Sequence, residues 1–242
     1  MADHRLVTLT GMGGIGKTRL ALEVARHLLP QFADGVWVAE LAPLCDPQLV
    51  PVTVATALGL ELARGVVSPE RIATALGSRQ IMLVLDNCEH VINAAAGMVE
   101  ALLHANPVAR VIATSREPLR AEGERLYRVP PLALPAEDTQ ALEDVVRHDA
   151  VALFVARAQA ADPHFALDRQ TAAAISSICR QLDGIPLAIE LAAARASTFG
   201  VQQLASRLDN RFSLLTEGRR ISFLKLIRRS DCRRVVDRGP FS

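Results

Sequence analysis

Residues 11–18 read Gly11-Met12-Gly13-Gly14-Ile15-Gly16-Lys17-Thr18 and fit the phosphate-loop pattern G-x-x-x-x-G-K-[ST] at every fixed position. The preceding residues 5–10 have the composition of a short buried strand. Residues 18–29 carry apolar side chains at the spacing of one helical face, and Pro30 ends that pattern. Strand, glycine-rich loop and helix in this order form the context in which the pattern binds phosphate.

The chemistry of this stretch points to a nucleotide with a metal ion. Glycines let successive backbone N–H groups converge on an anion, and the following helix directs the positive end of its dipole to the same place. Lys17 is one of only two lysines in an arginine-rich chain, and we expect it at the β- and γ-phosphates. The Thr18 hydroxyl would bind Mg²⁺. The predicted nucleotide-binding residues are Gly11, Gly13, Gly14, Ile15, Gly16, Lys17, Thr18 and Arg19.

Two further strands end in polar residues that fit the same chemistry. Residues 81–86 form a continuous apolar run that ends in Asp86, as expected of a central parallel strand. Asp86 then lies at the strand's carboxyl end in the Walker B position, where it would hold Mg²⁺ through water. Residues 109–114 form another buried strand, and Arg116 follows within reach of a γ-phosphate. The alternative for Arg116 is a solvated loop residue.

Composition bounds the remaining possibilities. The formal charge of +1 argues neither for nor against a nucleic-acid partner. Four cysteines form no C-x-x-C pair, and a metal site at Cys88 and His90 would lack a second pair of ligands. No apolar run approaches the roughly 20 residues of a membrane span, and no leader precedes the first strand. We therefore expect a cytoplasmic protein without a membrane partner.

The order of patterns predicts an α/β class, with a P-loop NTPase parallel sheet flanked by helices and followed by a small all-helical domain. Residues 1–130 would form the nucleotide-binding domain, with one helix predicted from Gln48 to Leu58 and another that Ser68 caps and Gly77 ends. A proline-containing linker over 131–148 leads to helices over 149–220, one of them capped by Asp168. Residues 221–242 read as a basic tail with scattered arginines, which is typical of a truncated or frame-altered product; a nucleic-acid-binding tail is the alternative.

Four motifs in order resemble an NB-ARC domain of the STAND ATPases found in bacterial transcriptional regulators of LuxR-type and related architecture. They are the phosphate loop, residues 83–90 (LVLDNCEH), residues 114–119 (TSREPL) and residues 182–191 (LDGIPLAIEL). The resemblance implies an ATP/ADP switch in which exchange of ADP for ATP opens the protein and promotes assembly with itself or with protein partners. It implies that Arg116 senses the γ-phosphate and that Pro186 lies against the nucleotide. Any contact with DNA would come from domains outside this chain.

Three departures from this family pattern qualify the expected activity. Asn87 stands where many relatives carry a second acid, and because an amide cannot act as a general base we expect slow hydrolysis. Glu89 is an available acid nearby, although an acid at the start of a helix is common. The chain starts too late for the family's adenine-contacting segment, so selectivity for ATP over GTP is open. The basic tail stands in place of a winged-helix unit.

The leading hypothesis is therefore an ATP/ADP-binding regulatory switch with slow hydrolysis, as part of a signalling or transcriptional regulator. The alternative is a catalytically competent P-loop NTPase or a kinase acting on a small substrate. A kinase would need an acceptor-binding lid, which the sequence does not indicate, and fast hydrolysis would need a base that Asn87 does not supply. A third possibility is a folded remnant that binds ADP poorly and no longer signals.

Overall fold

The computed structural model describes residues 4–61, 66–136 and 141–215. The chain divides into two compact units. The first contains the residues up to Leu132 together with Ile185–Ala188, and the second contains Ala133–Gly184 and the residues from Ile189 onward. The tail predicted over 221–242 lies outside the described residues.

The first unit is built on a parallel sheet of five strands in the order β2-β3-β4-β1-β5. This parallel sheet, flanked by helices, confirms the predicted α/β class. The strand that precedes the phosphate loop, β1, lies between β4 and β5, so β4 separates it from β3. The strands are β1 (Leu6–Thr10), β2 (Val36–Glu40), β3 (Met82–Asp86), β4 (Arg110–Ser115) and β5 (Glu124–Arg128).

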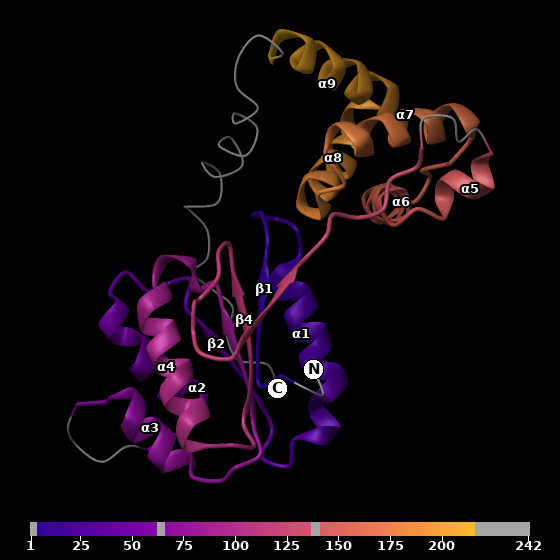
Figure 1. Ribbon diagram of the computed structural model, residues 1–242. Helices are drawn as coiled ribbons and strands as arrows, with labels where there is room; N and C mark the ends of the chain where they lie inside the picture. The colour runs from indigo at the N-terminus through magenta and orange to yellow at the C-terminus, as the bar shows by residue number, and fades with distance from the viewer. Residues whose placement is uncertain (1–3, 62–65, 137–140, 216–242) are drawn as a thin grey trace. The chain divides into compact units, whose positions relative to one another are not determined.

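Helices cover both faces of this sheet (Figure 1). One face is covered by α1 (Lys17–Leu28), and the other by α2 (Val50–Ala57), α3 (Pro69–Leu76) and α4 (Ile92–Ala105). Because both faces are covered, a central strand has to be apolar on both sides. The unbroken apolar run that predicted β3 follows from this arrangement.

The alternation of β3 side chains shows how the two layers are filled. Met82 and Val84 belong to the hydrophobic cluster that contains Ala21 and Ala25 of α1. Leu83 and Leu85 point to the opposite face and belong to the larger cluster under α2, α3 and α4. Small alanines on α1 let that helix pack closely against the strand that carries Asp86.

Local sequence signals explain some of the helix boundaries. Ser68 Oγ accepts a hydrogen bond from Arg71 N at 3.4 Å and caps α3, which ends before Gly77, as predicted. The helix predicted from Gln48 begins instead at Val50, because a 3₁₀ turn over Pro47–Leu49 precedes α2. The sequence analysis assigned no helix to the α4 range, although its buried residues recur at helical spacing (Ala95, Met98, Val99, Leu102 and Leu103).

In the second unit the described residues form helices only, as predicted, around buried side chains that include Phe154, Ile175 and Ile178. Asp168 begins α7 with a capping box in which it exchanges hydrogen bonds with Thr171. A short helix, α5, falls within the range predicted as linker. The domain boundaries themselves stay predictions. The helices are α5 (Leu142–Val146), α6 (Asp149–Ala161), α7 (Arg169–Gln181), α8 (Pro186–Phe199) and α9 (Val201–Leu215).

Candidate functional site

The loop between β1 and α1 has the backbone of an anion-binding turn. Gly11, Gly14 and Gly16 have φ of 147°, 80° and 97°, a region that L side chains rarely adopt. Gly16 is the N-cap of α1, and no side chain caps this end of the helix. The dipole at this end of the helix favours a negatively charged acceptor.

Lys17 lies folded over this loop. Its Nζ donates hydrogen bonds to the carbonyl oxygens of Gly11 at 3.0 Å and Met12 at 3.1 Å. Burial lowers the pKa of Lys17; the charge of Arg116 lowers this pKa further, whereas nearby carboxylates raise it. An anion bound in the loop would favour the charged ammonium, so the site is electrostatically suited to phosphate.

The two residues predicted to hold Mg²⁺ come together although 68 positions separate them in the chain. Thr18 Oγ1 donates a hydrogen bond to Asp86 Oδ1 at 2.7 Å. Thr18 stands in the first turn of α1 and Asp86 ends β3, so the contact spans the end of the intervening β4. A hydroxyl and a carboxylate are hard oxygen ligands of the kind that Mg²⁺ takes alongside phosphates and water. The pair therefore fits a magnesium ion.

Thr114 completes this arrangement, and sequence reasoning did not assign it to the site. Its Oγ1 donates to Asp86 Oδ1 at 2.6 Å and accepts a hydrogen bond from Asn87 N at 2.9 Å. Thr114 is only 1% exposed, and it stands on β4, between the phosphate-loop strand and the Asp86 strand. The signal in the sequence that could have assigned Thr114 to the site is a hydroxyl residue near the end of an otherwise apolar strand.

Arg116 meets a carboxylate in this structure. Its Nε lies 3.0 Å from Glu89 Oε1. The guanidinium also lies beside the phosphate loop, because a Cβ placed on Gly13 would come within 3.6 Å of Arg116 Nη2. The predicted contact of Arg116 with a γ-phosphate stays a prediction, and the structure adds that Glu89 competes for the same guanidinium.

Asn87, His90 and Cys88 are engaged in local structure. Asn87 adopts a left-handed φ of 64°, and its Nδ2 lies 3.3 Å from His90 Nδ1, while His90 Nε2 lies 2.9 Å from Leu41 O. Burial raises the pKa of the Cys88 thiol to about 12. Among the described residues no group of three His, Cys, Asp or Glu side chains is placed to hold a metal. The Cys88–His90 alternative therefore gains no support.

The remaining predicted residues take their expected places in the elements. Ile15 is buried within the loop, Arg19 is exposed in the first turn of α1, and Pro186 opens α8. Their contacts with a nucleotide stay predictions.

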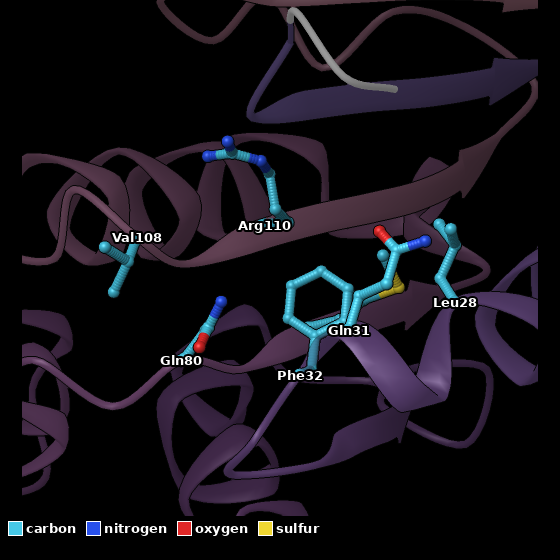
Figure 2. A pocket seen from close by; sticks show the side chains of 7 residues that line it. Leu28, Gln31, Phe32, Gln80, Val108 and Arg110 are labelled. Atoms are coloured by element: carbon cyan, nitrogen blue, oxygen red, sulfur yellow. The ribbon is translucent and has the colours of Figure 1, made fainter.

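A separate hollow of about 440 Å³ opens at the opposite end of the strands (Figure 2). Its lining includes Met82 and Arg110, the first residues of β3 and β4. No residue of the phosphate loop contributes to it. The phosphate site and this hollow therefore lie at different edges of the sheet.

Known proteins with similar sequences include bacterial regulators. Over 215 residues the chain is 38% identical to an uncharacterized protein of Mycobacterium tuberculosis, covering 89% of this chain and 52% of that protein. It is 41% identical over 218 residues to a protein of the same organism provisionally named an HTH-type transcriptional regulator, covering 90% of this chain and 23% of that protein. Regulatory protein AfsR of Streptomyces griseus is 29% identical, with 86% of this chain and 20% of that protein covered. The chain thus spans about half the length of the curated relatives it matches, or less.

No family model matches the chain. The ORC2 protein of Aeropyrum pernix, whose structure was solved as ADPNP–ADP complexes, superimposes with a TM-score of 0.50 at 14% identity, covering 84% of this chain and 61% of that one. This likeness supports the fold alone. Assignment to NB-ARC stays a prediction, as does the cytoplasmic location. Within the described part of the chain, no helix combines the length and apolar character that crossing a membrane requires.

Proposed function

We propose that the first unit binds ATP and ADP with Mg²⁺, and that the chain is the nucleotide-dependent switch of a larger transcriptional regulator. The observation that carries this proposal is the 2.7 Å hydrogen bond between Thr18 and Asp86. It joins the end of a complete phosphate loop to a carboxylate on a second strand, which is the composition expected of a nucleotide–magnesium site.

In this proposal each group has a separate task. The glycine loop and the uncapped amino end of α1 hold the phosphates, and Lys17 supplies a mobile positive charge. Thr18 and Asp86 would hold Mg²⁺, which would neutralise charge on the phosphate oxygens. Thr114 keeps the Asp86 carboxylate in place through its hydroxyl.

The site is suited to binding more than to turnover. Asn87 carries no acid, and its amide lies against His90. Because an amide cannot deprotonate water, hydrolysis would be slow, and nucleotide state would persist long enough to act as a signal. A nucleotide shifts conformation only by its differential affinity for two states, so the ATP form would favour partners or self-association through that difference.

The regulatory part of the proposal is supported by the names of the relatives. One is provisionally named an HTH-type transcriptional regulator and another is Regulatory protein AfsR. Since the chain covers about a fifth of each, we assign it the nucleotide-dependent step and assign DNA contact to other segments of such a regulator.

Ligand-dependent unfolding tests the proposal. Trp37 is the only tryptophan of the chain and lies on β2, so its fluorescence reports on the first unit. We expect ADP·Mg²⁺ or ATP·Mg²⁺ at 100 times Kd to raise the free energy of unfolding by about 2.7 kcal/mol. GTP·Mg²⁺ measured alongside tests base selectivity.

Lys17→Ala is the control for this measurement and should abolish most of the stabilisation. No stabilisation by any nucleotide, in a chain that still unfolds cooperatively, would contradict nucleotide binding by this chain. Turnover well above about 1 s⁻¹, in the range of ordinary enzymes, would favour the NTPase or kinase alternative over a switch.

A further inference from the structure

The guanidinium of Arg116 lies near both the phosphate loop and the carboxylate of Glu89. On one side is the phosphate loop, with Gly13 close enough that an added Cβ would lie 3.6 Å from Nη2. On the other side is the carboxylate of Glu89, at 3.0 Å from Nε. One guanidinium is thus placed to bind either a phosphate or a carboxylate, because each presents two negatively charged oxygens to its planar fork of N–H donors.

Among the described residues Glu89 forms its ion pair with Arg116, and the charge of Lys17 acts on it as well. Its side chain is only 18% exposed, against 51% for Arg116. Its second oxygen, Oε2, is buried and has no hydrogen-bond partner among the described residues. A partly buried carboxylate that loses the cation paired with it regains little hydration, so much of the cost of its desolvation remains. Drawing Arg116 away from Glu89 is therefore unfavourable, whatever attracts the guanidinium.

We infer that Glu89 holds Arg116 back from the position of a third phosphate and so sets a preference for the diphosphate over the triphosphate. This inference rests on the proposed nucleotide binding and identifies Glu89 as the residue that sets the relative affinity for the two nucleotides. A diphosphate in the loop leaves the Glu89–Arg116 pair intact. A triphosphate binds the guanidinium only if that pair breaks. The cost of separating Arg116 from Glu89 therefore reduces the net binding free energy of the triphosphate. Glu89 is a positioning residue in this account, because it acts through Arg116.

The position of the acid in the fold supports a specific role over a general surface charge. Glu89 lies in a 3₁₀ turn over Cys88–His90 that follows directly on the strand carrying Asp86. Its charge acts on Lys17 of the phosphate loop, together with the charges of Arg116 and Asp86. The turn is anchored, because Cys88 is buried and Val91 N donates a hydrogen bond to Cys88 O at 3.0 Å. The carboxylate is therefore presented from a fixed backbone.

The test compares the dissociation constants of ADP and of a non-hydrolysable imido analogue of ATP, both with Mg²⁺. Glu89→Gln should tighten the analogue and lower the ratio of analogue to ADP constants at least tenfold, equivalent to about 1.4 kcal/mol. ADP binding should change less than about threefold. Glu117→Gln is the matched control, because it makes the same charge change on an exposed residue next to Arg116 and should leave the ratio unchanged.

A double-mutant cycle with Arg116→Gln tests whether Glu89 acts through that residue. In the Arg116→Gln background, Glu89→Gln should lose most of its effect on the ratio. An equal effect in both backgrounds would mean direct repulsion of the phosphate and would overturn the inference, as would an unchanged ratio in Glu89→Gln. If Glu89→Gln does not fold, Glu89→Asp keeps the charge, draws the carboxylate back by one methylene group, and should shift the ratio in the same direction.

Failure of the proposed function and failure of the inference about Glu89 give different results. If the wild-type chain binds neither nucleotide, the proposed function fails and this inference fails with it. If it binds both and the ratio does not respond to Glu89, only the inference fails.

Discussion

Replacing Thr114 by valine removes a buried hydroxyl and leaves the side-chain shape nearly unchanged. The hydroxyl makes two hydrogen bonds, one to the Asp86 carboxylate at 2.6 Å and one from Asn87 N at 2.9 Å. Because Thr114 is 1% exposed, water cannot easily replace either partner. The substitution therefore tests the arrangement that positions the predicted magnesium ligand.

The expected cost follows from these two bonds. A hydrogen bond to a charged group contributes about 1.5–3 kcal/mol, and a backbone N–H left without an acceptor costs about 1–3 kcal/mol. Thr18 still donates to Asp86 at 2.7 Å and relieves part of the loss. We expect Thr114→Val to lower the free energy of unfolding of the first unit by about 2–4 kcal/mol. It should also weaken the contribution of Mg²⁺ to nucleotide binding.

Urea unfolding followed by Trp37 fluorescence measures this loss in the unit that contains the site. Thr114→Ser is the matched control, since it keeps the hydroxyl and removes a methyl group, at an expected cost of about 0.5–1.5 kcal/mol. A Thr114→Val protein within about 0.5 kcal/mol of the wild type, or more stable than Thr114→Ser, would refute the reasoning.

Three further predictions concern the glycines of the first unit and the buried thiols. Gly16→Ala should lower the free energy of unfolding by about 1–3 kcal/mol, because the φ of Gly16 is 97°. Gly97→Ala, inside α4, should raise the free energy of unfolding by about 0.5–1 kcal/mol. If urea unfolding shows that both substitutions lower the stability, the prediction is wrong. Burial raises the pKa of Cys88 and Cys179 to about 12, so iodoacetamide at pH 8 should modify exposed Cys45 before either of these two thiols. Peptide mapping measures the modification, and equal rates at the three cysteines would contradict the prediction. The same raised pKa should make the free energy of unfolding fall as pH rises above 9.0, because the unfolded thiols release protons that the folded ones keep.

Much of the fold could be predicted because its signals are local. The phosphate loop, the cap at Ser68 and the capping residue Asp168 are read from a few neighbouring positions, and the structure contains the predicted helices at each. The apolar run before Asp86 indicated a strand covered on both faces, which the two hydrophobic clusters confirm. The α4 helix was missed even though its pattern was present, and the start of α2 was placed two residues early.

The contacts among the side chains of the candidate site could not be predicted from such local signals. Sequence reasoning selected Thr18, Asp86 and Arg116 one by one, and their roles toward a nucleotide stay predictions. It did not assign Thr114 to the site, and it noted Glu89 without its partner. Both omissions concern contacts between segments, because 28 positions separate Thr114 from Asp86 and 27 separate Glu89 from Arg116.

The sequence by itself therefore determined most of the strands and helices and several of the residues that end them, because burial and capping leave a trace in neighbouring residues. Only the tertiary structure decided the strand order β2-β3-β4-β1-β5, and with it that Thr18 and Thr114 both donate hydrogen bonds to Asp86. The physical reason is that any parallel order of these apolar strands satisfies the same periodicity. The choice among orders depends on packing and hydrogen bonds between residues far apart in the chain.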